Sequence, residues 1–334
     1  MADARGGARD PGRETYLKRR IVQCIALLFT NSYFVSIPRA TFYQGTLKGV
    51  CVPVLNCYAC PLAWGSCPIG ALQHFVIVRQ FPFYVLGILG VIGVFVGRFP
   101  CGWFCPFGWF QEIVYKLKLP KFSAPNWLRH MKYVVLIVVC GLIAWWTYEP
   151  WFCKICPAGT LEGGLPWLLW KARGSDGAEG MSFLTWVFGI KVIVLAALVL
   201  LMGMMRRPFC RFICPLGALL GLSNKFSLLQ MDTHLEDCAI AYAMGSDFKN
   251  CASCMYCSKD CPMGLKVPEE IGSVDCIRCM NCTSFGSVYW KMNLGQGGRG
   301  TVRGRAEAAA ARGAAREAEI ARETGEKPEA LDSS

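Results

Sequence analysis

Four long apolar stretches, separated by polar and basic segments, are the dominant pattern along this chain. They lie at approximately Ile21–Ile37, Phe75–Val96, Tyr133–Tyr148 and Phe183–Met205. A helix that spans a bilayer needs roughly 20 apolar residues. Because four such runs recur and each is bounded by lysines and arginines, we expect membrane helices rather than core helices of a soluble protein. The pattern predicts an α-helical integral membrane protein with about four transmembrane helices.

The basic residues are distributed unevenly between these stretches. Six precede the first stretch, six lie between the second and the third, and three follow directly after the fourth. By the positive-inside rule, both termini face the cytoplasm, and we expect a multi-pass protein of the inner (plasma) membrane, surrounded by lipid. No small-residue cleavage site follows Ile37, so the first stretch is interpreted as an anchor and not a secretory signal. This topology accounts for most of the net charge of +12 without nucleic acid as a partner.

Composition narrows the class of protein further. Of 334 residues, 54% are hydrophobic, 17% are charged and 20 are cysteines. A small disulfide-stapled secreted domain would be shorter and would lack long apolar runs. A soluble enzyme would carry more charge. The cysteines therefore indicate a membrane protein with metal sites.

The cysteines also form an internal repeat. A CxxCP motif that begins at Cys57 and a CxxxCPxG motif that begins at Cys101 flank the second apolar stretch. The same two motifs, at Cys153 and Cys210, flank the fourth stretch. An arginine precedes each CxxxC motif by three residues, and a lysine follows its second cysteine by eleven. This agreement predicts a membrane domain that is built from two duplicated halves.

The predicted topology sorts these motifs into two sites. The inner site consists of Cys101, Cys105, Cys210 and Cys214. The outer face offers five candidate ligands, namely Cys57, Cys60, Cys67, Cys153 and Cys156. Four converging thiolates suit an iron–sulfur cluster, so we expect one or two [4Fe–4S] clusters in the membrane domain. Disulfides are the alternative at the outer face, and which of the five outer cysteines is spare stays open.

After Phe226 the chain becomes polar, and its cysteine spacing matches bacterial ferredoxins. The first run consists of Cys251, Cys254, Cys257 and Cys261, followed by proline. The second run, Cys276, Cys279 and Cys282, lacks its last cysteine because Gly286 stands there. In the usual crossover arrangement Cys261 joins the second run, and we predict that Cys238 completes the first. The alternatives are a three-iron cluster, or a four-iron cluster with a ligand other than cysteine.

These patterns divide the chain into parts. We predict a basic N-terminus at 1–20, a membrane domain at 21–226 with repeats at about 57–118 and 153–227, a ferredoxin-like module with two [4Fe–4S] clusters at 227–295, and a tail at 296–334. The tail is rich in alanine, arginine and glutamate and typical of a disordered segment, so it receives no chemistry.

Three polar residues near the predicted outer ends of the helices are candidates for the environment of a cluster or a quinone. They are Arg79, Lys191 and His74. Ionisable groups at membrane depth often mark function. Snorkelling to the interface is the alternative for Arg79 and Lys191. His130 is a further candidate ligand for a quinone or haem, although a solitary interfacial histidine is more often structural.

Together, the paired CxxxCP motifs and the ferredoxin run resemble the membrane-bound polyferredoxin family, over roughly Cys57 to Trp290. That family includes the quinol-dehydrogenase subunit of periplasmic nitrate reductase, its methylamine-dehydrogenase relative, the nitrous-oxide-reductase regulator and the cytochrome-oxidase assembly ferredoxin. The resemblance implies an electron-transfer subunit of an oxidoreductase, similar to a quinol dehydrogenase. Its partners would be a quinone or another redox protein.

The function we predict is electron transfer between cytoplasmic ferredoxin-type clusters and a quinone or extracytoplasmic partner, through clusters in the membrane domain. One alternative is a copper-handling or copper-reducing assembly factor, because soft thiolates select Cu(I). Another is a redox-sensing membrane regulator. Direction of electron flow does not follow from the sequence.

Overall fold

The structure is a computed structural model. It describes residues 11–39, 41–122, 124–173, 186–233, 256–267, 269–285 and 288–292. Contacts divide the chain into two compact units, Met1–Asn293 and Leu294–Ser334. All described residues belong to the first unit, so the predicted tail lies outside them.

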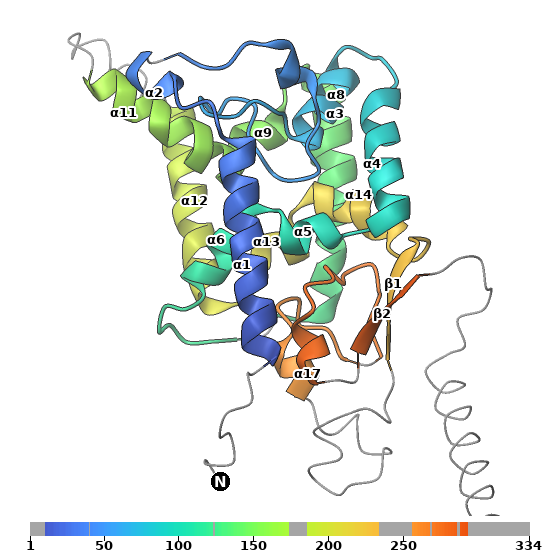
Figure 1. The fold of residues 1–334 in the computed structure, drawn as a ribbon. Coiled ribbons are helices and arrows are strands. Elements are labelled where there is room, and N and C mark those ends of the chain that lie inside the picture. The colour runs from blue at the N-terminus through green and yellow to red at the C-terminus, as the bar shows by residue number, and fades with distance from the viewer. Residues whose placement is uncertain are drawn as a thin grey trace, which may run out of the picture. The chain divides into compact units, whose positions relative to one another are not determined.

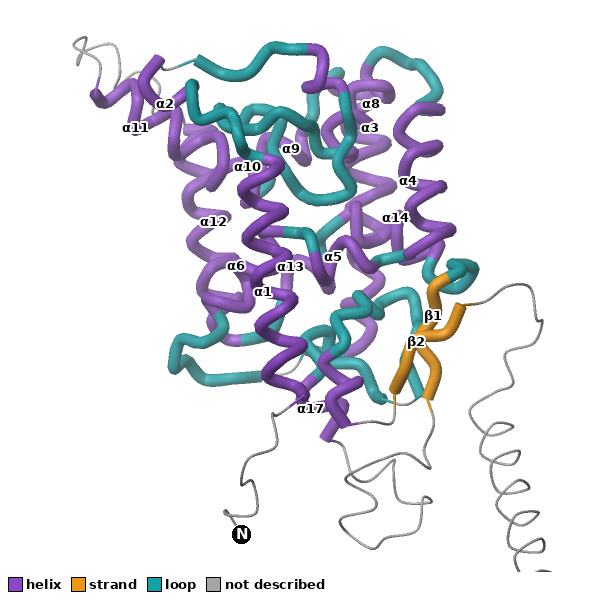
Figure 2. The backbone as a smooth tube through the Cα atoms, viewed as in Figure 1, coloured by secondary structure: helices purple, strands orange, loops and turns teal. Residues whose placement is uncertain are grey.

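Helices dominate the first unit, and its described residues include two short strands (Figures 1 and 2). The elements of the first half are α1 (Pro11–Thr30), α2 (Ser36–Arg39), η1 (Thr46–Gly49), α3 (Pro68–Ile77), α4 (Phe83–Val96), α5 (Phe99–Trp103) and α6 (Pro106–Val114). Those of the second half are η2 (Asn126–His130), α7 (Met131–Val134), η3 (Val135–Ile143), α8 (Ala144–Thr147), α9 (Trp151–Ile155), α10 (Pro157–Gly159), η4 (Thr160–Gly164), α11 (Leu165–Arg173), α12 (Trp186–Met204), α13 (Pro208–Phe212) and α14 (Pro215–Ser223). The last elements are β1 (Leu229–Thr233), α17 (Tyr256–Asp260), η7 (Asn281–Phe285) and β2 (Val288–Met292).

The first helix differs from its prediction at both ends, because α1 begins at Pro11 and ends at Thr30. Its early turns are polar, but Arg19 is buried there and its charge is paired inside the protein. At the other end, the Thr30 hydroxyl donates to the Ala26 carbonyl and the Asn31 amide donates to the Leu27 carbonyl. These side chains compete for the backbone groups of the last turn, so the helix ends before Ile37.

The prediction of one continuous helix over Phe75–Val96 is wrong. α3 ends at Ile77, and α4 begins only at Phe83. Between them Arg79 has a φ of 59°, a conformation that is unfavourable for any residue with a Cβ. Pro82 directly precedes α4, and a proline also disfavours helical backbone in the residue before it.

The third apolar segment forms one continuous helical span, from Asn126 to Thr147, with a mean hydropathy of 1.6. It ends at Tyr148, whose φ is 56°. Among the described residues, this is the one helix that is both long and apolar enough to cross a membrane. The apolar helices at 68–77, 83–96 and 188–204 are shorter. Four transmembrane helices therefore remain a prediction.

The short helices α5 and α13, which carry Cys101 and Cys210, lie across the middle of the longer helices in Figure 1. Gln23, from the middle of α1, donates its side-chain N–H to the Gly102 carbonyl at 3.0 Å. The CxxxC motifs therefore lie partway along the helices and not at one end of them.

β1 and β2 pair in antiparallel register, with Met231 opposite Trp290. Met231 of β1 and Val288 of β2 have buried side chains. The pairing joins the segment that leaves α14 to the segment that follows the last cysteine run, and so it closes the C-terminal region against the helices.

Candidate functional site

The inner cysteine set (Cys101, Cys105, Cys210 and Cys214) is buried in the core of the first unit. Cys101 and Cys210 lie on the short helices α5 and α13. Cys105 and Cys214 are the N-caps of α6 and α14, each with a proline at the first helical position. Proline fits that position because its missing N–H would have no helical partner there. Each CxxxCP motif therefore forms a helix–turn–helix corner that presents two thiols.

Two arginines link these corners through reciprocal contacts. Arg98 donates to the Cys210 carbonyl at 3.3 Å, and Arg207 donates to the Cys101 carbonyl at 3.0 Å. A Cβ at Gly217 would lie 2.7 Å from the Arg98 guanidinium, so only glycine leaves room for it. Each arginine thus crosses from its own motif to the other one.

The sulfurs of the inner set receive several N–H donors. Gln111 donates to Cys210 Sγ at 3.0 Å, and the Gly217 amide donates to Cys214 Sγ at 3.4 Å. Burial raises the pKa of Cys105 to about 12, and the neighbouring thiolates of Cys210 and Cys101 also raise it. Four buried thiols with N–H donors and two arginines fit the ligand shell of an iron–sulfur cluster, which carries negative charge.

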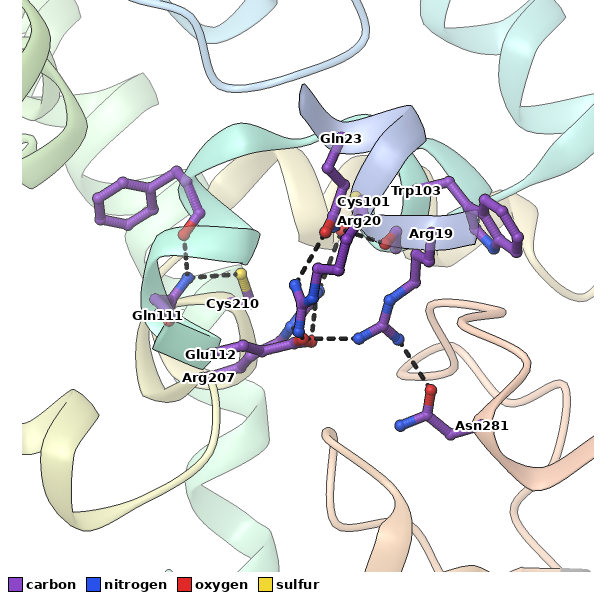
Figure 3. A network of polar contacts seen from close by, with 12 residues as sticks. Arg19, Arg20, Gln23, Cys101, Trp103, Gln111, Glu112, Arg207, Cys210 and Asn281 are labelled. Carbon is purple, nitrogen blue, oxygen red and sulfur yellow. Dashed lines mark hydrogen bonds and ion pairs between the residues drawn. The ribbon is translucent and has the colours of Figure 1, made fainter. Parts of the chain in front are cut away.

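One carboxylate, Glu112, organises the charges below the inner set (Figure 3). It forms ion pairs with Arg19 at 2.6 Å, with Arg207 at 2.6 Å, and with Arg20. Burial acts to raise the pKa of Glu112, but Arg207, Arg19 and Arg20 outweigh it and lower the pKa to about 2. Arg19 also donates to Asn281, at the end of the cysteine run of the ferredoxin-like module.

The other arginine, Arg98, has a carboxylate from a distant part of the chain. Asp275 lies 3.6 Å from Arg98 and also pairs with the buried Lys132. In the predicted repeat, the position equivalent to Glu112 is Gly221, which has no side chain to pair with Arg98. The ferredoxin-like module therefore supplies this charge.

The loop before Cys279 docks directly on the inner motifs. Trp103 donates its indole N–H to the Arg278 carbonyl at 3.0 Å. A Cβ at Gly102 would lie 2.4 Å from the Ile277 carbonyl oxygen and 3.5 Å from the Cα of Cys279. Close backbone contact thus joins the residue after Cys101 to the second cysteine run.

Arg278 and Asn224 fasten the same loop. The fully buried Arg278 donates to the carbonyls of Val96 and Asn224 at 2.8 and 3.1 Å. Asn224 donates to the Ser273 and Cys276 carbonyls at 2.8 and 2.7 Å. Loop 273–279 therefore accepts hydrogen bonds from Asn224 and donates others through Arg278, and both sets hold it against the helices.

Within the module, Cys261, Cys276, Cys279 and Cys282 lie near one another. Burial raises the pKa of Cys282, and the thiolates of the other three raise it further. Cys257 also contributes to this rise. Cys261 and Cys257 of the first run therefore both lie near the second run, and the assignment of Cys261 to it remains a prediction. Cys238, Cys251 and Cys254 lie outside the described residues, so the ligands of the first run remain a prediction.

The outer cysteines also approach one another. Burial raises the pKa of Cys153, and the thiolates of Cys67, Cys156 and Cys57 raise it further. Cys60 has a different surrounding, because its thiol donates to the Asn31 side chain at 3.5 Å. No three His, Cys, Asp or Glu side chains in the described part of the chain converge closely enough to hold a single metal ion. A four-iron cluster is larger than one ion and is held by thiolates that lie further apart.

The polar candidates at the helix ends do not join these cysteine sets. Arg79 lies in the turn between α3 and α4, where it donates to the Tyr148 hydroxyl and stacks 5.0 Å from the Trp145 ring. His74 is exposed on α3, and Lys191 is half-buried on α12. Sequence reasoning placed Arg79 inside a helix because it did not detect the break at Pro82.

Several residues at the site were not singled out from the sequence. They are Gln73, Gln111, Glu112, Glu162 and Asp275. One available signal was the repeat itself, because Gln73, Gln111 and Glu162 each lie six residues after the cysteine of a Cys-Pro-x-Gly motif. The role of Asp275 had no such signal, since its partner is distant in sequence.

Comparison with known proteins identifies the chemistry of these motifs. A family model described as a 4Fe-4S binding domain matches residues 80–125, 132–174 and 185–231. These segments contain both CxxxCP motifs and the CxxCP motif that begins at Cys153. No solved structure matches.

Three relatives illustrate the range of similar proteins. An uncharacterized protein of Methanocaldococcus jannaschii is 28% identical over 232 residues, which are 65% of this chain and 82% of the relative. The regulatory protein NosR of Stutzerimonas stutzeri is 24% identical over 54% of this chain and 22% of its own length. The "Putative electron transport protein YccM" of Escherichia coli is 24% identical over 58% of this chain and 49% of its own length. The matched segments therefore support a polyferredoxin-like family, and the chain is similar to one protein named as a regulator and to another named as a putative electron transport protein.

Proposed function

We propose that this chain is a membrane electron relay that connects the ferredoxin-like module, through the inner cysteine set, to a quinone or an extracytoplasmic redox protein. The observation that carries the proposal is the docking of loop 273–279 on the inner motifs. Gly102, next to Cys101, is in backbone contact with Ile277 and Cys279. The ligands of two predicted cluster sites thus belong to touching segments.

The residues around the inner set suit a group that changes charge by one electron. A [4Fe–4S] cluster, when bound, supplies one-electron transfer and requires no general base or nucleophile. Cys101, Cys105, Cys210 and Cys214 would hold it, and their burial excludes water. The guanidinium groups of Arg98 and Arg207 favour the more negative reduced state, which raises the reduction potential.

The reciprocal contacts of Arg98 and Arg207 support two duplicated halves in the membrane domain. Large apolar side chains on the helix surfaces support a lipid environment, because soluble monomers rarely expose so much apolar surface. Examples are Phe29 on α1 (65% exposed), Phe83 on α4 (75%) and Trp146 on α8 (79%). With the distribution of basic residues, they favour a multi-pass protein of the inner membrane with cytoplasmic termini.

Iron and acid-labile sulfide in anaerobically purified protein test the relay directly. Cys210→Ser should lose about four iron atoms per chain, because one four-thiolate site is removed. Cys24→Ser is the matched control, since Cys24 is a half-buried cysteine of α1 outside both cysteine sets. Equal iron in Cys210→Ser and wild type would refute the inner site.

Electron transfer needs its own measurement. Wild-type protein reduced with dithionite and then freed of it should be reoxidised by decylubiquinone, followed by visible absorption. The Cys210→Ser protein should keep its module clusters but react far more slowly with the quinone. A wild-type protein that does not react with decylubiquinone, yet is reoxidised by a soluble redox protein, identifies the second type of partner.

Redox sensing is a second candidate function, because one relative is named a regulatory protein. A sensor would change the contacts of its module with oxidation state without passing electrons onward. Hydrogen exchange of loop 273–279 that differs between oxidised and reduced protein, with no reoxidation by either acceptor, would favour sensing.

A further inference from the structure

Two turns organise the outer cysteines. Cys67–Gly70 and Cys156–Gly159 both have the sequence Cys-Pro-x-Gly, and each begins a helix with proline at its first position. A Cβ on the glycine of the first turn would lie 3.7 Å from Cys153 Sγ, and on the glycine of the second 3.4 Å from Cys57 Sγ. The first turn therefore faces Cys153, which precedes the second turn, and the second turn faces Cys57, which precedes the first.

Two side chains repeat this crossing. Six residues after Cys67, Gln73 accepts a hydrogen bond from the Cys153 thiol at 3.1 Å. Six residues after Cys156, Glu162 accepts one from the Cys57 backbone N–H at 2.8 Å. Gln111, six residues after Cys105 in the inner set, likewise reaches Cys210 of the other half. The outer and inner sets thus share one construction.

The side-chain amide of Gln73 has an N–H group that makes no hydrogen bond to the described residues. The residue is fully buried, yet its Nε2 has no hydrogen-bond partner among the described residues. A buried N–H without a partner is costly. The sulfur atoms of a bound cluster would accept this hydrogen bond.

Cys60 and Cys140 lack this construction. The Cys60 thiol is directed to Asn31, and its carbonyl accepts a hydrogen bond from Lys48 at 3.4 Å. Cys140 lies near Cys153 but belongs to the middle of η3, where it neither begins a Cys-Pro-x-Gly turn nor supplies one of the atoms nearest to a Cβ at Gly70 or Gly159.

We propose that Cys57, Cys67, Cys153 and Cys156 form a second four-thiolate site that binds an iron–sulfur cluster, and that Cys60 is not a ligand. This inference rests on the proposed relay function and assigns the ligands of its outer cluster site. The 4Fe-4S family model supports the cluster type, because one matched segment, 132–174, includes Cys153 and Cys156.

A short backbone segment joins this site to the inner one. The backbone N–H of Leu55 acts to lower the pKa of the Cys105 thiol, and that of the next residue, Asn56, acts to lower the pKa of the Cys67 thiol. Adjacent residues of one segment therefore lie beside a cysteine of each set.

Two serine variants from the same loop provide the test. Cys67→Ser and Cys60→Ser protein, purified anaerobically in detergent, are compared with wild type in iron, acid-labile sulfide and electron paramagnetic resonance after reduction with dithionite. Cys67→Ser should lose about four iron atoms and one resonance signal, while Cys60→Ser keeps both. Cys140→Ser should also keep both.

Each other outcome overturns the assignment. Equal losses in Cys60→Ser and Cys67→Ser would make Cys60 a ligand, and no loss in Cys67→Ser, or copper in place of iron, would remove the cluster. If Cys67→Ser does not fold, the wild-type iron content decides, with about sixteen atoms expected and about twelve contradicting the outer site. Cys210→Ser in the same series separates the two proposals. Loss there without loss in Cys67→Ser refutes only the outer site, whereas no loss in either refutes the relay.

Discussion

The two arginines beside the inner cysteines occupy equivalent positions in the repeat but receive their counter-charge from different places. Arg207 pairs with Glu112, seven residues after Cys105 and on helix α6. Arg98 pairs with Asp275, directly before Cys276 of the ferredoxin-like module. The arginine of the second CxxxCP motif thus has its counter-charge on the neighbouring helix α6, whereas that of the first motif receives it from the segment around Cys276.

This difference gives each half a separate role. The Glu112 pocket joins α1 to α6 and α13, because Arg19 and Arg207 come from the two flanking helices. The Asp275 pocket joins the module to the helices through Arg98 and Lys132. Substitutions in the first should therefore weaken the helical domain, and substitutions in the second should weaken docking.

The largest effect is expected for Glu112→Gln. Three arginines lose their shared carboxylate, and a buried charge without a partner is strongly destabilising, by about 5 kcal/mol. Thermal unfolding in detergent measures it as a lower Tm. Glu149→Gln, which breaks the exposed pair with Lys154, is the control and should change stability by less than about 1 kcal/mol. Similar Tm values for both variants would contradict a structural role for Glu112.

Acid should weaken the same pocket. The pKa of Glu112 is lowered from 4.5 to about 2 in the folded protein, so its contribution is complete above pH 4.5 and is lost as the pH falls toward 2. This pH-dependent part accounts for about 3 kcal/mol of the loss expected for Glu112→Gln. The Tm difference between wild type and Glu112→Gln should therefore narrow between about pH 5 and pH 3. A constant difference over this range would contradict a pKa of Glu112 that is lower in the folded protein than in the unfolded one.

Asp275→Asn should release the module with a smaller loss of stability, about 3 kcal/mol, because Lys132 loses its carboxylate while Arg98 keeps the carbonyls of Val274 and Cys210 as partners. Hydrogen exchange should rise in loop 273–279 and in β1, while α1 and α6 keep their protection. Equal loosening of α1 would show that the two pockets are not separate.

The smallest effect, about 1 kcal/mol, is expected for Gly221→Ala. The added Cβ would lie 2.7 Å from the Val274 carbonyl oxygen, so loop 273–279 must shift away from α14. Gly90→Ala is the matched control, because nothing lies within 4 Å of a Cβ there. Faster exchange of the Cys276 region in the first variant and not in the control would support docking through this contact.

Much of the molecule follows from local sequence. A proline follows Cys105 and Cys214, and α6 and α14 begin at these prolines because proline fits the first turn of a helix. The family comparison supports [4Fe–4S] clusters in the matched segments, which contain these motifs. Apolar runs located α12 and the helical span that ends at Thr147, since their composition alone favours burial or lipid.

Hydropathy did not predict helix boundaries correctly where polar side chains form ion pairs inside the protein or where the backbone breaks a helix. Arg19 looks like a solvated basic residue, but Glu112 neutralises it in the interior, so α1 extends through a polar segment. Arg79 and Pro82 break an apolar run because backbone conformation, and not side-chain polarity, ends α3.

The sequence by itself determined which residues carry the chemistry, since cysteine spacing, proline and charge act over a few residues. The tertiary structure decided how they are combined. It directed the Cys60 thiol to Asn31, placed Leu55 and Asn56 beside the two cysteine sets, and gave Arg98 a carboxylate from 177 residues away in the chain. These arrangements depend on contacts between distant segments, whose geometry is set by the packing of the whole domain.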